Sequence, residues 1–233
     1  MRRIAVSRCY ICGEPLAGDK KQENLDHIPP KQLFAKSLRT SKTRFIQVRT
    51  HEKCNNSYKL DEQYFTHALL PFGRGSVAGD ALRLKAVAEY QAGEQTRLVE
   101  RILSQAKTEI NGILLPRGKI WLDYELDRIE RVVGKIIKGL HFLDAQEIIN
   151  LPGDIGMRIT LPGQAPPQDY QNIMAAFPSE SRGEHEGVFA YRSFVEDDVH
   201  FWALLIWDRI IITAGFRVQQ ESGSASTEEG RIS

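Results

Sequence analysis

The spacing of apolar positions predicts helices in the middle of the chain. Between residues 80 and 111, apolar side chains recur at steps of four and share one helix face: Leu98, Ile102, Ala106 and Ile110. Residues 122–143 have a stronger amphipathic pattern, with apolar residues interleaved with charged ones at helical spacing. The apolar set is Leu126, Ile129, Val133, Ile136, Ile137 and Leu140, and the charged set is Asp127, Arg128, Glu130, Arg131, Lys135 and Lys138.

The pattern changes to that of strands after Gly187. Runs rich in β-branched and aromatic residues are separated by short acidic or charged turns, which predicts an antiparallel meander of three strands. The strands are expected at 188–194, 199–207 and 210–218. Trp202 and Trp207 are expected in the core of this sheet, with base stacking as the lesser alternative.

These patterns divide the chain into an N-terminal module, a connection, a larger domain and a tail. All three cysteines lie in the module, and the connection is rich in glycine, which is typical of a linker or mobile loop. The tail has no large apolar residue before Ile232 and is expected to be disordered. The predicted boundaries are 1–66, 67–79, 80–218 and 219–233.

Composition changes this picture little, but the distribution of charge adds to it. With 42% hydrophobic and 26% charged residues, the 233-residue chain is typical of a globular protein. It lacks an apolar run for a membrane span or a secretory signal, and has too few cysteines for a disulfide scaffold, so we expect a cytoplasmic protein. Residues 1–60 hold 13 Lys and Arg against 5 Asp and Glu, a net charge of +8 on a chain of net charge +1. This asymmetry favours a local polyanion-binding face, although a solvated surface with chance asymmetry explains the charge equally well.

Two Cys-x-x-Cys-like pairs predict a zinc site. Cys9 and Cys12 are two residues apart and Gly13 follows, which suits a tight metal-binding turn. His51 and Cys54 repeat the spacing, so the four side chains supply one tetrahedral Cys₃His set. The alternatives are a redox-active Cys9–Cys12 pair, or a buried Cys54 beside a surface His51.

Between and after these pairs stand Asp26-His27 and Asn55. In this order, the motifs resemble the HNH endonucleases, whose ββα-metal motif is often held by a zinc bound through two knuckles. The matching features here are Cys9 and Cys12, Asp26-His27, the loop 29–42, the strand 44–49, His51 and Cys54, Asn55, and a helix through Tyr64. The resemblance covers about 60 residues and implies a zinc-stapled ββα-metal module. Together with the helical segment and the C-terminal antiparallel meander predicted from the patterns above, the expected fold class is α+β.

The resemblance also implies roles for three residues. Asp26 and Asn55 would hold one catalytic Mg²⁺ or Mn²⁺ ion, and His27 would be the general base that activates water. The chemistry suits these residue types, because an imidazole titrates near neutral pH and hard cations prefer carboxylate and amide oxygens. The alternative is a turn-capping Asp26 and a surface His27.

The sequence departs from the family at two points. His51 replaces a cysteine, which zinc tolerates. Ile46 stands near where the family has the asparagine that orients the catalytic histidine, so we expect Gln47 or a backbone carbonyl to substitute, or activity to be weak or lost. Adjacent strand residues face opposite sides, so Asp26 and His27 need a local twist to serve one site.

Four basic residues are candidates for contacts with nucleic acid, namely Arg44, Arg49, Lys53 and Lys59. Asp61 and Glu62 could add metal ligands, but we expect them to be surface charges.

The leading hypothesis is a metal-dependent endonuclease acting on double-stranded DNA rather than RNA. Such modules occur in restriction, phage defence and toxins. Residues 80–218 would serve specificity, docking of a partner protein or homodimerisation. The alternative is a zinc-stabilised module that binds nucleic acid or protein without cutting it.

Overall fold

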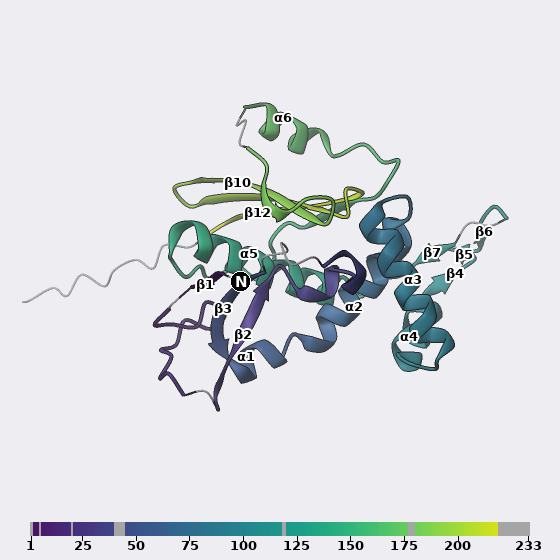
Figure 1. Ribbon diagram of the computed structural model, residues 1–233. Coiled ribbons are helices and arrows are strands. Elements are labelled where there is room, and N and C mark those ends of the chain that lie inside the picture. The colour runs from purple at the N-terminus through teal and green to yellow at the C-terminus, as the bar shows by residue number, and fades with distance from the viewer. Residues whose placement is uncertain are drawn as a thin grey trace, which may run out of the picture.

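The computed structural model combines helices with antiparallel sheets (Figure 1). It describes residues 2–4, 6–19, 21–39, 45–117, 120–176 and 180–218. The tail predicted over 219–233 lies outside the described residues. None of the helices in the described part is long and apolar enough to cross a membrane.

A small sheet forms the N-terminal part. Its strands are β1 (Arg2–Ile4), β2 (Glu23–Ile28) and β3 (Ile46–His51), in the order β1-β3-β2, with β2 antiparallel and β1 parallel to β3. Two short 3-10 turns, η1 (Lys31–Leu33) and η2 (Lys36–Leu38), lie in the loop between β2 and β3. The strand expected at 44–49 thus begins and ends two residues later.

The helix expected from Asn55 onward consists of α1 (Glu52–Asn56) and α2 (Lys59–Leu69). Asn55 therefore lies in the last turn of α1 and does not open a helix. Because α1 begins directly after β3, His51 at the strand end and Cys54 in the helix are brought to the same corner.

The segment 67–79 was expected to be a linker or mobile loop. In the structure it is packed and mostly helical, so this prediction is wrong. It contains the end of α2, the 3-10 helix η3 (Leu70–Gly73) and the start of α3 (Val77–Gln91), which Ser76 caps by accepting from Gly79 N–H at 3.0 Å. A Cβ at Gly79 would lie 2.1 Å from the Gly73 carbonyl oxygen. The two glycines are therefore needed for the close approach of two backbone segments.

The prediction of a single helix over 80–111 is also wrong. Besides α3, the region holds α4 (Thr96–Ser104) and the start of a small β extension. Gly93 and Gln95 adopt positive φ angles of 76° and 57° and interrupt the helix. The extension consists of β4 (Ala106–Lys107), β5 (Glu109–Ile110), β6 (Ile113–Leu114) and β7 (Trp121–Leu122).

The C-terminal meander is confirmed, within a larger sheet. Its strands are β10 (Phe189–Glu196), β11 (Val199–Ile206) and β12 (Ile210–Arg217). The edge strands β8 (Arg158–Thr160) and β9 (Arg182–His185), which the sequence pattern did not reveal, extend it to five antiparallel strands in the order β8-β12-β11-β10-β9.

The long helix α5 (Leu126–Ala145) confirms the predicted amphipathic segment and lies between the C-terminal sheet and the N-terminal part (Figure 1). The helix α6 (Gln168–Ala176) lies on the other side of the sheet, where Tyr170 packs against Phe201 with ring centroids 5.9 Å apart. Because α5 is covered on both sides, part of its charged face is also buried, including Lys135.

One hydrophobic core runs through both halves of the chain. Trp202 and Trp207 are 1% and 0% exposed, which confirms their expected place in the core. The Trp207 indole N–H donates to the Leu33 carbonyl at 3.0 Å, and so ties the C-terminal sheet to the loop after β2. The core thus crosses the boundary expected between residues 66 and 80.

Candidate functional site

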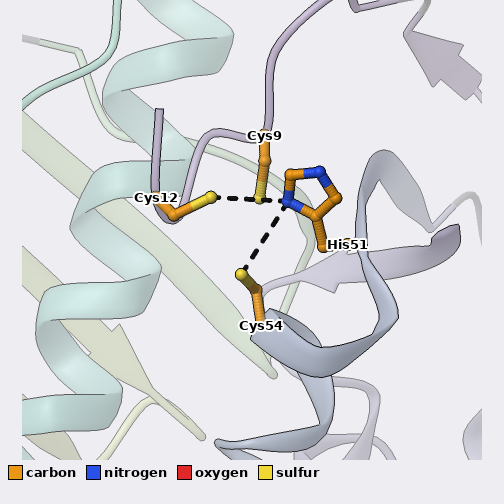
Figure 2. A group of neighbouring side chains, drawn as sticks. All are labelled: Cys9, Cys12, His51 and Cys54. Atoms are coloured by element: carbon orange, nitrogen blue, oxygen red, sulfur yellow. Dashed lines mark hydrogen bonds between the residues drawn. The ribbon is translucent and has the colours of Figure 1, made fainter. Parts of the chain in front are cut away.

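The four predicted zinc ligands lie together at one corner of the N-terminal part (Figure 2). Their ligand atoms are all within 4.8 Å of one another. The Sγ atoms of Cys12 and Cys54 lie 3.4 and 4.0 Å from His51 Nδ1. Zinc–sulfur bonds of about 2.3 Å in a tetrahedron place sulfurs about 3.8 Å apart, so this cluster has the dimensions of a zinc site.

The surroundings of the cluster also suit zinc. His51 Nε2 lies 3.1 Å from the Pro15 carbonyl, so its N–H donates there and Nδ1 is free to bind a metal. Gly13 turns the knuckle with a φ of 81°, and its N–H donates to the Cys9 carbonyl at 2.8 Å. Burial raises the pKa of the Cys54 thiol to about 12, and zinc binding would release that proton. The chain therefore carries a Cys₃His group that fits structural zinc.

Asp26 on β2 is nearly completely buried, with 4% of its surface exposed. Oδ2 accepts from the Tyr10 hydroxyl, while Oδ1 accepts from the His27 N–H at 2.8 Å. The Lys135 ammonium of α5 lies 3.0 Å from Oδ1 and 2.9 Å from Oδ2. Each carboxylate oxygen of Asp26 thus has donors from the protein itself.

Asn55 reaches the same place from α1. Its Nδ2 donates to Asn24 Oδ1 at 3.1 Å, and this acceptor is shared with the Thr50 hydroxyl at 3.1 Å. Asn24 and Thr50 are paired across β2 and β3, so the hairpin orients the amide. The remaining oxygen, Oδ1 of Asn55, accepts from Lys135 Nζ at 3.1 Å.

His27 lies opposite Gln47 in the β2–β3 register, and the ring Nε2 is 2.9 Å from the amide Nε2 of Gln47. Phe45 holds the imidazole edge-to-face, with centroids 5.5 Å apart. Burial, reinforced by the charge of Lys31, lowers the pKa of His27, so the ring is neutral at pH 7. The expected substitute for the missing asparagine therefore contacts the histidine.

Asp26, His27 and Asn55 line one cleft of about 180 Å³. Strand alternation directs Asp26 toward α5 and His27 toward Gln47, yet the cleft at the end of β2 borders both. A neighbouring cleft of about 320 Å³ shares Lys31 with it. The basic residues that line this second cleft are Lys31, Lys36, Arg39 and Lys85.

The four residues predicted to contact nucleic acid have different positions. Lys59 lines the first cleft. Lys53 is exposed on α1, and Arg49 is half-exposed and lies 3.6 Å from Glu23. Arg44 lies outside the described residues. Lys31, Lys36 and Lys85 were not singled out from the sequence, where isolated lysines carry no distinguishing pattern.

Lys135 is a site residue that no pattern in the sequence indicates. It is 2% exposed, and Nζ contacts Glu62 Oε1 at 2.5 Å in addition to Asp26 and Asn55. Burial opposes its charge, but the carboxylates of Asp26 and Glu62 outweigh that effect and raise the pKa of Lys135. The oxygens that the HNH resemblance associates with Mg²⁺ or Mn²⁺ thus surround an ammonium group, and a divalent ion does not fit among them in this arrangement.

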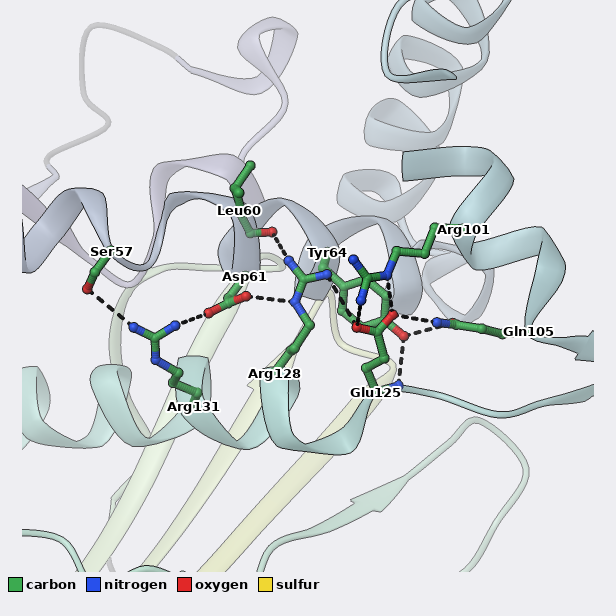
Figure 3. A network of polar contacts seen from close by, with 9 residues as sticks. All are labelled: Ser57, Leu60, Asp61, Tyr64, Arg101, Gln105, Glu125, Arg128 and Arg131. Carbon is green, nitrogen blue, oxygen red and sulfur yellow. Dashed lines mark hydrogen bonds and ion pairs between the residues drawn. The ribbon is translucent and has the colours of Figure 1, made fainter. Parts of the chain in front are cut away.

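A polar network docks the helix that carries Lys135 (Figure 3). Asp61 on α2 is buried, contrary to the expected surface charge, and pairs with Arg131 and with Arg128 Nε, the latter at 2.7 Å. Arg128 also donates to the Leu60 carbonyl at 2.8 Å. Glu62 is likewise turned inward, toward Lys135. These contacts set the position of α5 against α2.

Comparison of the chain with protein-family models, curated proteins and solved structures found no match. The assignment of a function therefore depends on the residues and geometry of the site.

Proposed function

We propose that this chain is a zinc-stabilised nuclease of the HNH type that hydrolyses phosphodiester bonds in nucleic acid, with DNA preferred over RNA. The observation that carries the proposal is His27, which lies against Gln47 and shares a cleft with Asp26 and Asn55. The Cys₃His group joins the knuckle to β3 and α1, the elements that hold Gln47 and Asn55.

His27 acts as the general base. With its amide turned so that Oε1 faces the ring, Gln47 accepts from Nε2–H and leaves Nδ1 free to take a proton from the attacking water. The water oxygen bonds to phosphorus, the P–O bond to the leaving sugar oxygen breaks, and that oxygen takes a proton from solvent. The lowered pKa of His27 keeps the ring unprotonated at pH 7, as a base requires. Asp26 is a positioning residue, because its carboxylate holds the His27 backbone N–H.

The basic residues along the two clefts bind the phosphates. Lys31 and Lys59 border the cleft with His27, and Lys36 and Arg39 continue the positive surface along the neighbouring cleft. Contacts of this kind position a nucleic acid backbone without reading its sequence. No step of this reaction uses Mg²⁺ or Mn²⁺, because Lys135 occupies the place between Asp26 and Asn55.

The residues after the module serve to dock a partner or a second copy of the chain in this proposal. Exposed apolar side chains on the β extension support this role, among them Leu114 and Trp121, which are 74% and 52% exposed.

Cleavage of supercoiled plasmid tests the proposal. Wild-type protein should nick or linearise the plasmid, and His27→Ala should not, at equal zinc content and equal melting temperature. RNA is the parallel substrate. If neither protein cuts either nucleic acid, the nuclease proposal is wrong.

A second function, binding of nucleic acid without cleavage, is favoured by the Lys135 contacts, since they satisfy the acidic residues internally. It predicts salt-dependent binding that is equal for wild type and His27→Ala.

A further inference from the structure

We infer that Lys135 is a built-in cation that permanently replaces the divalent metal among Asp26, Asn55 and Glu62. The site therefore does not bind Mg²⁺ or Mn²⁺, and whatever it does to nucleic acid it does without them. The consequence for cleavage rests on the proposed function, whereas the claim about metal binding stands on the geometry alone.

The oxygens converge on a single point from three elements. Asp26 comes from β2, Asn55 from α1 and Glu62 from α2, and their oxygens lie between 2.5 and 3.1 Å from Lys135 Nζ. A carboxylate, an amide and a second carboxylate form the kind of oxygen set that Mg²⁺ or Mn²⁺ binds, and Mg²⁺ needs oxygens at about 2.0–2.1 Å. Here the ammonium group stands at that centre.

The ammonium also donates to acceptors from all three residues of the site. Its contacts with Asp26, Asn55 and Glu62 match the three N–H groups that a lysine can donate. Asp26 receives two further donors, the Tyr10 hydroxyl and the His27 N–H. Removing Lys135 from this place would leave two largely buried carboxylates without their counter-charge, a costly arrangement.

The helix that carries the lysine is held on both sides of it. It comes from the middle of α5, and Arg128 and Arg131, on the preceding turns, are held by Asp61 (Figure 3). One turn further on, Lys138 donates to the Ile11 carbonyl at 3.2 Å. Nζ also lies 5.3 Å from the Tyr58 ring centroid. Because α5 is fixed on both sides of Lys135, the helix holds the base of this side chain beside the oxygens of the site.

Binding of Mn²⁺ to the zinc-loaded, full-length protein tests the inference, with free Mn²⁺ measured by electron paramagnetic resonance. Wild type should bind no Mn²⁺ in the site. Lys135→Ala should gain about one equivalent, because the freed oxygens need a cation, and Lys135→Ala combined with Glu62→Gln should lose it. Lys138→Ala is the matched control, since it removes a lysine from the same helix without touching these oxygens, and it should gain nothing.

Two results would overturn the inference: Mn²⁺ binding by wild type that Asp26→Asn abolishes, or no gain of binding in a folded Lys135→Ala protein. If Lys135→Ala is too unstable to titrate, Mn²⁺ should raise its melting temperature by linkage, and an unchanged melting temperature would count against the inference. The wild-type titration decides independently of any variant.

Cleavage gives a separate readout. A wild-type nuclease should cut equally well with and without added Mg²⁺ in metal-free buffer, after its zinc content has been verified. Cleavage that requires Mg²⁺ would overturn the inference. Absence of all cleavage would refute the proposed function, and the Mn²⁺ titration would still test the inference about metal binding.

Discussion

Replacement of Gln47 by leucine should separate stability from activity. Gln47 is 6% exposed, and one end of its amide contacts His27 Nε2 at 2.9 Å. The atom at the other end, Oε1 in this orientation and Nε2 once the amide is turned toward the ring, is buried without a hydrogen-bond partner among the described residues. Leucine has nearly the same volume, so Gln47→Leu removes the amide while the packing stays filled.

The contacts set the size of both effects. Loss of the bond to His27 costs about 1 kcal/mol, whereas removal of a buried, unpaired polar atom returns about 1–3 kcal/mol. The free energy of unfolding should therefore stay the same or rise by up to about 2 kcal/mol, which raises the melting temperature of a chain this long by a few degrees. Cleavage should fall by about 10- to 100-fold, because the general base loses the group that orients it.

Thermal unfolding by circular dichroism and plasmid nicking on the same samples measure the two effects. Gln22→Leu, at an exposed glutamine next to the same hairpin, is the control and should change neither. A melting temperature that falls by several degrees would refute the energetic reasoning. Unchanged cleavage in an active enzyme would refute the positioning role of Gln47.

The remaining predictions concern the zinc group and the glycine contact. Cys54→Ser should lose zinc, measured by metal analysis, and lower the melting temperature, because the binding free energy of a structural zinc of this kind is about 10–16 kcal/mol; an unchanged melting curve after chelation would show that the group does not stabilise the fold. Gly79→Ala should destabilise the chain by about 1–3 kcal/mol in urea unfolding, since its Cβ would meet the Gly73 carbonyl oxygen at 2.1 Å. Gly153→Ala, where a Cβ meets nothing within 4 Å, is the control, and equal midpoints for the two variants would contradict the clash.

Local patterns predicted those elements whose sequence signal is contained within a few residues. The meander follows from runs rich in β-branched and aromatic residues, and α5 from its helical periodicity. The edge strands β8 and β9 lack such runs and pair only because the meander offers free edges. The glycines around the start of α3 have the composition of a linker, and only the packing of Gly73 against Gly79 and Trp207 shows that they permit close contact.

The features of the candidate site likewise divide into those that the sequence indicates and those that depend on the fold. The spacing of Cys9 and Cys12, and of His51 and Cys54, determines that each pair converges, because two intervening residues form a single turn around a metal. The sequence also indicated the Asp26-His27 pair and Gln47 as the substitute for the missing asparagine. Their contacts, however, depend on the register of β2 with β3.

The sequence alone determined the two halves of the Cys₃His group, an amphipathic helix and the strands of a C-terminal meander, because each depends on residues close together in the chain. Only the tertiary structure decided that a lysine 109 positions after Asp26 lies among the oxygens of the site. That placement results from the docking of α5 between two sheets, where the arginines of its charged face meet Asp61. A charged helix face looks the same in sequence whether it faces water or a buried carboxylate, so only the packing of the whole chain distinguishes the two.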